Sequence, residues 1–378
     1  MLVILALLAF FAIALPDAML GVAWPYMRVT FDQPLAAMTL VLPFGVAATL
    51  VSTSGWTWAA ARLGLGRLLT VSITVSTVAL LASALAPAYW VILGCAVLFG
   101  LSAGAVDAAL NAYAARHFGP RLINAMHAAY GIGAATSPLA VTAVVATGAS
   151  WRWAYAAVMV LQGALALLFA ASAGRWQDTS PAGTGARPAA RAGRLPRRAV
   201  AGLLTVVVES GLEAAVGLWA FVYLLEALAL PAPVAGGVVS GYWAALVVGR
   251  LLLGALAERT GTWPVIAAAT GTLVVAAGLL TPGRPLPAAA GVVLLGLAAA
   301  PIYPLLVLTT GERTAPHLVD RLVGFQAAAS TVGSVTFAGL TGLLLGAELT
   351  LFPWCVLALA LLTVGGIAVI RPGRSPAP

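Results

Sequence analysis

Long apolar runs, each about the length that crosses a membrane, follow one another through almost the whole chain. Of the 378 residues, 62% are hydrophobic and only 8% are charged, and the mean hydropathy is +1.04. A soluble domain is about 25% charged, so the composition excludes a soluble protein and predicts an all-α membrane protein. The two cysteines, Cys95 and Cys355, lie in apolar runs and are expected to be packing thiols rather than metal ligands.

Apolar runs bounded by Gly, Pro and Arg predict twelve membrane-spanning helices, because a bilayer core needs about 20 apolar residues per helix. The expected spans are 2–26, 35–58, 67–86, 89–114, 122–148, 152–174, 199–226, 233–257, 263–281, 286–310, 322–346 and 350–370. An even number of spans places both termini on the same side of the membrane.

The arginines predict which side that is. All nineteen basic residues are arginine; fifteen fall on the side of the termini, three on the other side, and Arg250 lies within a span. Because positive loops are retained in the cytoplasm, we expect both termini to be cytoplasmic and the protein to lie in the inner (cytoplasmic) cell membrane. The basic pI of about 10.2 follows from this topology and gives no reason to expect a nucleic-acid partner.

The chain reads as two six-helix halves joined by a polar linker. We expect an N-terminal six-helix bundle at 1–174, a cytoplasmic linker rich in Arg, Pro and Gly at 175–198, a C-terminal bundle at 199–371 and a short cytoplasmic tail at 372–378. The linker composition is typical of a flexible connection. A parallel repeat of two six-helix halves is a transporter architecture, with the binding site near mid-membrane.

Residue correspondences support this duplication. Arg62 and Gly64, after the second span, recur 197 positions later as Arg259 and Gly261, after the eighth span. Asp17, followed by a glycine four residues later, corresponds at an offset of 196 to Glu213, which is followed by a glycine at the same spacing. Several such pairs at nearly one offset indicate an internal repeat.

Four carboxylates lie inside apolar spans: Asp17, Asp107, Glu209 and Glu213. An ionisable group at membrane depth is costly and marks an ion or substrate pathway. Glu209 and Glu213 are one helical turn apart and are not expected to ionise together, so one of them would keep a proton. We rank Asp17 and Glu213, expected to face each other across a pseudo-twofold axis, as the strongest proton-coupling candidates. Glu209 ranks as the weakest.

Further polar and aromatic residues complete the candidate site. Asp107 and Asn111 share a face of the fourth span, and His127 lies at a similar depth in the fifth. An Asp, an Asn and a His at one level suit a hydroxylated solute or a proton relay. The other candidate solute-binding residues are Tyr303, between two prolines that interrupt the tenth span, Gln326, and the deep tryptophans Trp219 and Trp243.

The same residues also admit structural interpretations. Asp107 can act as a hydrogen-bonding link between helices, Glu209 as a bystander in a cavity, and His127 as a buried hydrogen-bonding residue. The two deep tryptophans can be core packing, and Arg250 is interpreted as a gate or loop ion-pair partner in preference to a substrate ligand. No phosphate-binding loop or metal-ligand spacing is visible, so neither a cofactor nor a metal is expected.

One loop segment carries a family resemblance. GALAERTG, 254–261, which contains Glu258, Arg259 and Gly261, resembles the Gly-x-x-x-acidic-Arg-x-Gly loop motif of the major facilitator superfamily. Its counterpart TWAAARLG, 57–64, keeps Arg62 and Gly64 but has Thr57 and Ala61 where the motif has glycine and an acid. The resemblance implies the major facilitator fold and a cytoplasmic gate around these loops.

Within that superfamily the chain is most similar to the L-fucose permease branch. The similarity is carried by DAALNAY (107–113), INAMHAAYGIGAA (123–135), ESGLEAAVGLW (209–219), SGYWAALVVGRLLLG (240–254), PIYP (301–304) and VGFQAAASTVG (323–333). In that branch acids of the first and fourth spans are associated with proton coupling and sugar binding. The resemblance therefore implies these roles for Asp17 and Asp107.

We therefore expect a proton-coupled secondary active transporter of a small hydroxylated solute, a sugar or polyol, that works by alternating access of the two halves. Its partners would be the solute, protons and the lipid bilayer, and it is expected to be a monomer and not an enzyme. One alternative is a proton-driven exporter of amphipathic drugs or metabolites. Another is a membrane sensor or scaffold that keeps the fold without transporting.

Overall fold

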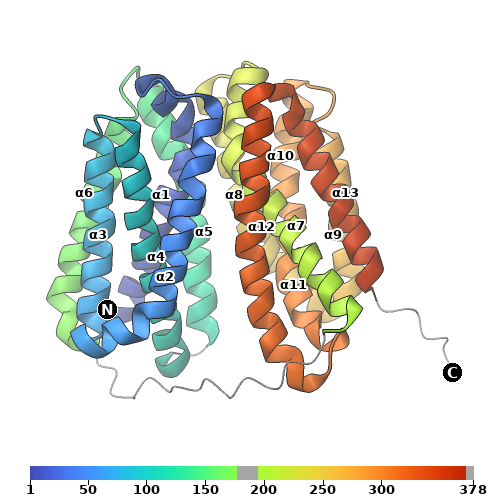
Figure 1. The fold of residues 1–378 in the computed structure, drawn as a ribbon, viewed down its shortest axis with the longest axis horizontal. Coiled ribbons are helices and arrows are strands. Elements are labelled where there is room, and N and C mark those ends of the chain that lie inside the picture. Colours follow the sequence, from blue (N-terminus) through green and yellow to red (C-terminus); the bar gives the residue numbers. More distant parts are fainter. Residues whose placement is uncertain (119, 177–194, 372–378) are drawn as a thin grey trace. The chain divides into compact units, whose positions relative to one another are not determined.

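The computed structural model describes residues 1–118, 120–176 and 195–371, and these are almost entirely helical (Figure 1). The predicted tail and most of the predicted linker lie outside the described residues. The first helices are α1 (Leu2–Thr30), α2 (Met38–Leu63), α3 (Leu65–Leu85), α4 (Tyr89–His117), α5 (Pro120–Val145) and α6 (Arg152–Ser172). They are followed by α7 (Arg197–Val222), α8 (Ala232–Thr260), α9 (Thr262–Gly278), α10 (Pro285–Ala299), α11 (Ile302–Leu308), α12 (Val319–Ala347) and α13 (Phe352–Ile370).

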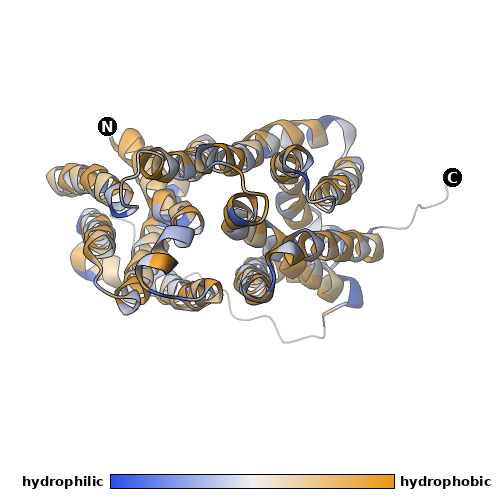
Figure 2. Ribbon diagram, turned by 90° about the horizontal axis from the view of Figure 1, so that it is seen from above, coloured by the Kyte–Doolittle hydropathy of each residue, from blue (hydrophilic) through white to orange (hydrophobic). Residues whose placement is uncertain are grey.

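Each predicted span overlaps a helix or a helix pair. Among the described residues, eleven segments are long and apolar enough to cross a membrane, and the shorter apolar helix α9 covers the remaining predicted span. The tenth span is broken as predicted: α10 ends at Ala299 and α11 begins at Ile302. Pro301 stands at the break because a proline has no N–H for the helix. Figure 2 shows hydrophobic residues along nearly every helix.

The chain forms two compact units. Unit 1 is Met1–Thr184 with Pro231–Ser240, and unit 2 is Gly185–Leu230 with Gly241–Pro378. In unit 1, α1 packs on α5, α2 on α4, and α3 on both α4 and α6. In unit 2, α7 packs on α12 and α13, and α9 on α10 and α13. The first residues of α8 are grouped with unit 1, whereas the predicted boundary assigned the whole helix to the second half.

The turns that follow α2 and α8 have the same backbone conformation. Gly64 has φ 79° and ψ 151°, and Gly261 has φ 92° and ψ 153°. In each case the glycine N–H bonds the carbonyl four residues earlier, and the next helix starts at the following residue. Positive φ is accessible to glycine at little cost. The glycines of the two loop motifs are therefore explained as tight turns between antiparallel helices.

Close helix contacts are also duplicated. Gly133 of α5 lies against the carbonyl of Phe11 in α1, and Gly333 of α12 lies against the carbonyl of Val207 in α7. A Cβ atom at either glycine would collide with that backbone. Small residues permit such close approach of membrane helices. The α1–α5 crossing of unit 1 is thus repeated by the α7–α12 crossing of unit 2, in agreement with the predicted internal repeat.

Candidate functional site

Asp17 lies in the middle of α1 and is exposed, although Pro16 and Ala18 beside it are buried. The Tyr130 hydroxyl, from α5, donates a hydrogen bond to Asp17 Oδ2 at 3.1 Å. Sequence analysis missed Tyr130. Its position three residues after His127, on the same helical face, was the available signal. The structure therefore gives Asp17 a phenol partner that comes from a different helix.

The predicted Asp107, Asn111 and His127 cluster is present in unit 1. Asn111 Nδ2 donates to Asp107 Oδ1 at 3.0 Å, and His127 interacts electrostatically with Asp107. The His127 ring is exposed and stands edge-to-face against Phe10, with centroids 5.4 Å apart. Asn111 Oδ1 is buried and has no hydrogen-bond partner. Because the Asp107–Asn111 bond lies within one helix, it does not link α4 to a neighbour, and one acceptor remains open for a donor.

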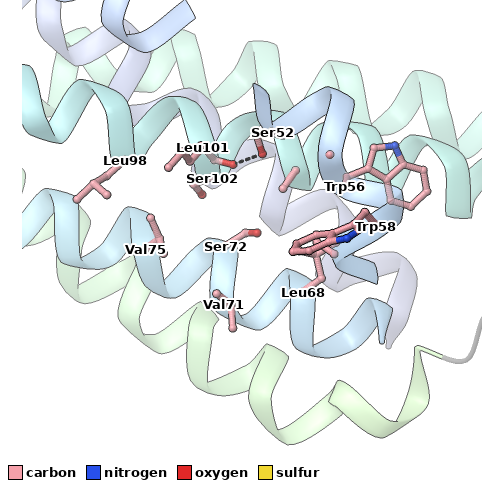
Figure 3. Close-up of a pocket in the computed structure, with 13 residues that line it drawn as sticks. Ser52, Trp56, Trp58, Leu68, Val71, Ser72, Val75, Leu98, Leu101 and Ser102 are labelled. Atoms are coloured by element: carbon pink, nitrogen blue, oxygen red, sulfur yellow. Dashed lines mark hydrogen bonds between the residues drawn. The ribbon is translucent and has the colours of Figure 1, made fainter. Parts of the chain in front are cut away.

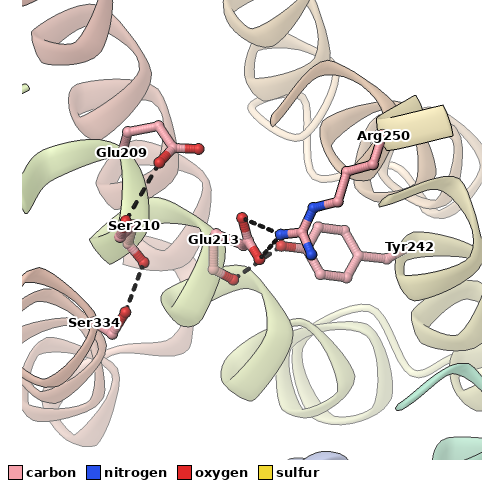
Figure 4. Close-up of polar contacts among 6 residues, drawn as sticks. All are labelled: Glu209, Ser210, Glu213, Tyr242, Arg250 and Ser334. Atoms are coloured by element: carbon pink, nitrogen blue, oxygen red, sulfur yellow. Dashed lines mark hydrogen bonds and ion pairs between the residues drawn. The ribbon is translucent and has the colours of Figure 1, made fainter. Parts of the chain in front are cut away.

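In unit 2, Glu213 of α7 forms an ion pair with Arg250 of α8 (Figure 4). Arg250 Nη2 lies 3.1 Å from Oε1 and 3.5 Å from Oε2 of Glu213. The Tyr242 hydroxyl donates to the backbone carbonyl of Glu213 at 2.9 Å. Sequence analysis placed Arg250 with the cytoplasmic gate and did not pair it with Glu213. The pair could have been expected from the general rule that an arginine within a membrane span pairs with an acidic side chain.

Glu209, one turn before Glu213, is fully buried. Its Oε2 accepts a hydrogen bond from the Ser210 hydroxyl at 3.4 Å, and its Oε1 has no hydrogen-bond partner (Figure 4). It interacts electrostatically with Glu213 and Arg250. An unpartnered ionised carboxylate at this depth is costly. Glu209, ranked weakest from sequence, is thus the one buried acid among the four intramembrane carboxylates, and one of its oxygens has no partner.

Two predicted solute-binding residues are instead packed within unit 2. Trp219 is fully buried and its indole N–H donates to the Ala338 carbonyl at 2.8 Å. Gln326 is also fully buried; its Oε1 accepts from the Thr310 hydroxyl at 3.0 Å and its Nε2 donates to the Leu306 carbonyl at 3.5 Å. Their polar groups bond other parts of the protein. This favours the core-packing interpretation that was open for Trp219, and it gives Gln326, which was expected only as a solute-binding residue, a structural role.

Trp243 and Tyr303 lie close to the acidic face of α7. Trp243 contacts Tyr242 edge-to-face and approaches Gly217, and its buried indole N–H has no hydrogen-bond partner. Tyr303, at the start of α11, is half-buried and interacts electrostatically with Glu209 and Arg250. Both residues therefore remain solute-binding candidates, because Tyr303 interacts with Glu209 and Arg250 and Trp243 has an indole N–H without a partner.

The loop-motif residues lie at helix ends. The guanidinium of Arg62 lies over the Trp58 ring, 4.1 Å from its centroid. Glu258 and Arg259 are exposed in the last turn of α8, directly before the Gly261 turn. Within the described part of the chain, no group of three or more His, Cys, Asp or Glu side chains is arranged to hold a metal ion.

Comparison with known families identifies the protein class. The family model of the Major Facilitator Superfamily matches residues 6–335. The chain therefore belongs to the major facilitator superfamily, and it is a multi-pass membrane transporter with that fold rather than an enzyme. The predicted fold and superfamily are confirmed, while the L-fucose permease branch remains a prediction.

Solved structures of several transporters are similar to this chain. They include the nucleoside transporter NupG (TM-score 0.75, 14% identity, 98% of each chain covered). They also include a bacterial homologue of the human lysosomal transporter Spinster (0.76, 13%, 98% of this chain and 95% of that one) and a D-xylose–proton symporter (0.74, 13%, 97% and 96%). At these identities the likeness establishes the fold alone. No curated protein sequence matches the chain.

Proposed function

We propose that the chain is a proton-coupled transporter of a small hydroxylated solute, a sugar or a polyol, that works by alternating access. The observation that carries the proposal is the buried Glu209 carboxyl, which adjoins an ion pair that already engages Arg250. In this proposal Glu209 carries the coupling proton, whereas the sequence alone favoured Asp17 and Glu213.

Counting charges explains how a proton would be coupled. With Glu209 protonated, Glu213 and Arg250 neutralise each other and the group carries no net charge. Loss of the proton from Glu209 leaves two carboxylates and one guanidinium, and the excess negative charge is buried. An ionised Glu209 would then compete with Glu213 for Arg250. Proton release is thus tied to the position of a side chain on α8.

The solute part of the proposal depends on the mixture of donors and acceptors. A hydroxyl both donates and accepts a hydrogen bond. Unit 1 offers an unpaired acceptor, Asn111 Oδ1, and unit 2 separately offers an unpaired donor, Trp243 Nε1. Asp17 with Tyr130 offers a further carboxylate and phenol. Two of the similar structures are those of a nucleoside transporter and a D-xylose–proton symporter, and nucleosides and D-xylose are both hydroxylated. Their low identity to this chain means that the site residues must carry the proposal.

The proposal also includes an orientation of the chain in the membrane. Cytoplasmic termini and an inner-membrane location follow from the fifteen-to-three distribution of arginines on the two sides of the predicted spans. Because a symporter moves the proton and the solute in the same direction, an inwardly directed proton gradient would drive solute uptake. The rival function is export of cationic amphipathic compounds, for which Asp17 would act as the attracting charge.

Two measurements test the proposal. The first is a thermal-shift screen of purified protein against sugars, polyols and cationic drugs at two pH values, since a bound ligand raises the melting temperature. We expect stabilisation by a sugar or polyol. The second adds that solute to proteoliposomes while external pH is recorded, and we expect the medium to become more alkaline. Stabilisation by cationic drugs alone, or solute uptake without proton movement, would contradict the proposal.

A further inference from the structure

A groove in unit 1 is lined by none of the candidate solute-binding or proton-coupling residues described above. It has a volume of about 310 Å³ and lies between α2, α3 and α4 (Figure 3). Its walls are mainly apolar and include Trp56, Trp58, Leu68, Val71, Leu98 and Leu101. The lining includes three serines, Ser52, Ser72 and Ser102. The Ser52 hydroxyl donates to the Leu101 carbonyl, and the buried Ser102 hydroxyl has no hydrogen-bond partner.

The groove opens beside exposed apolar side chains. Trp58 is 61% exposed and Val71 is 49% exposed. Both belong to membrane-spanning helices, where exposed apolar side chains meet lipid hydrocarbon. Water is stable in a cavity only when it finds two to four polar partners, and this groove offers few. Hydrocarbon is therefore the occupant that suits these walls.

Positive charge lies beside the groove. Arg62 stacks on the groove-lining Trp58 at 4.1 Å, and Arg67 is exposed in the first turn of α3, just across the Gly64 turn. A tryptophan next to arginines at a helix end is typical of the membrane interface. By the arginine distribution this interface is the cytoplasmic one, whose leaflet carries anionic lipids. Arg62 and Arg67 suit the negative charge of a lipid phosphate, and the apolar groove suits the acyl chain of the same lipid.

We propose that this groove binds one anionic phospholipid, with an acyl chain between α2 and α3 against α4 and with its phosphate at Arg62 and Arg67. The site is independent of the solute and of the proton acids. Its occupant is a lipid of the surrounding bilayer, and an apolar chain and an anionic headgroup are both required for binding.

The chain offers a matched pair of variants for the test. Gly55 lines the groove, and a Cβ atom there would meet nothing within 4 Å. Gly55→Leu therefore fills the groove without moving backbone, and it replaces glycine by a better helix former. Gly94 of α4 is exposed, does not line the groove, and also leaves its Cβ in open space. Gly94→Leu is the same chemical change outside the site.

The experiment measures binding of phosphatidylglycerol and phosphatidylcholine to delipidated protein by native mass spectrometry. We expect the wild type to prefer phosphatidylglycerol, Gly55→Leu to bind it about tenfold more weakly because chain contacts are displaced, and Gly94→Leu to bind it like the wild type. The double variant Arg62→Gln with Arg67→Gln should lose the preference between the two lipids, whereas Arg284→Gln should keep it.

A second measurement does not depend on the folding of any variant. Phosphatidylglycerol with a photoreactive acyl chain is crosslinked to wild-type protein, and the labelled peptides are mapped. Labelling concentrated in residues 52–75 and 98–105, which contain the lining residues of α2, α3 and α4, supports the site. Labelling elsewhere, unchanged binding in Gly55→Leu, equal affinity for both lipids, or displacement of phosphatidylglycerol by inorganic phosphate alone in the mass spectra would overturn the proposal.

Discussion

Arg250 Nη2 and Glu213 Oε1 lie 3.1 Å apart and join α8 to α7 through an ion pair in the middle of two membrane-spanning helices. The arginine side chain is 46% exposed and the glutamate side chain 21% exposed. The pair is therefore accessible, whereas Glu209, one turn away, is fully buried. The proton-coupling account depends on this arrangement of one guanidinium and two carboxylates, in which Arg250 pairs with Glu213 and Glu209 Oε1 has no hydrogen-bond partner.

Removing the guanidinium should disable coupling. Arg250→Gln leaves Glu209 and Glu213 without a cation, so the buried Glu209 should hold its proton and no longer release it. We expect proton-driven solute accumulation to be lost. Arg250→Lys keeps the charge and should retain part of it. Accumulation assays in proteoliposomes compare the two variants, and equal, near-normal activity in both would argue against a role for the charge.

A double-mutant cycle isolates the pair itself. Because both side chains are partly exposed, the coupling between Glu213→Gln and Arg250→Gln should be small, about 1 kcal/mol in unfolding free energy. The melting temperatures of the two single variants and the double variant provide the measurement. Additive effects in the cycle would mean that the ion pair contributes nothing to stability.

Trp219→Phe distinguishes a core residue from a solute-stacking residue. The variant loses the hydrogen bond to the Ala338 carbonyl, which should cost about 1 kcal/mol of stability. The solute KM should stay unchanged. Trp243→Phe, which removes an unpaired donor beside Gly217 of α7, should instead raise KM. A raised KM with unaltered melting temperature in Trp219→Phe would restore Trp219 to the binding site.

Gly333 tests the duplicated helix crossing. A Cβ atom there would collide with the Val207 backbone, whereas at Gly339 of the same helix it would meet nothing within 4 Å. Gly333→Ala should therefore lower stability by about 1–3 kcal/mol, and Gly339→Ala should leave it unchanged or slightly raised. Thermal unfolding in detergent measures both. Equal melting temperatures would show that α7 and α12 do not cross closely at this point.

We expect the Asp17–Tyr130 contact to take part in solute binding and in proton coupling. Tyr130→Phe removes only the hydroxyl that donates to Asp17 and should raise the solute KM several-fold without lowering the melting temperature. Tyr155→Phe is the control, because that hydroxyl faces Met27 in the core. Asp17→Asn should abolish proton-driven accumulation and leave folded protein. Normal uptake in both Asp17→Asn and Tyr130→Phe would exclude this contact from transport.

The fold was predictable because membrane helices are local structures. Each needs about 20 apolar residues and satisfies its own backbone, so hydropathy and the positions of glycine and proline were enough to locate them. The break at Pro301 was also predictable from the sequence, because a proline has no N–H to donate within a helix. The identical turns at Gly64 and Gly261 were visible as a sequence repeat, although their left-handed backbone was not.

The site was only partly predictable because it depends on which helical faces meet. Helical spacing correctly paired Asp107 with Asn111 within α4. Spacing could not reveal that Tyr130 reaches Asp17, or that Arg250 reaches Glu213 from another helix. Depth along a span also could not distinguish the roles of the two deep tryptophans. The Trp219 indole N–H donates to the Ala338 carbonyl, whereas the Trp243 indole N–H has no hydrogen-bond partner.

The most direct test of the central claim compares Glu209→Gln with Glu348→Gln in two assays on proteoliposomes. Glutamine mimics the protonated acid, so Glu209→Gln should lose accumulation driven by a proton gradient but keep exchange of solute across the membrane, which needs no net proton movement. Glu348→Gln makes the same change at an exposed glutamate and should behave like the wild type. Gradient-driven accumulation at the wild-type level in Glu209→Gln would contradict the account.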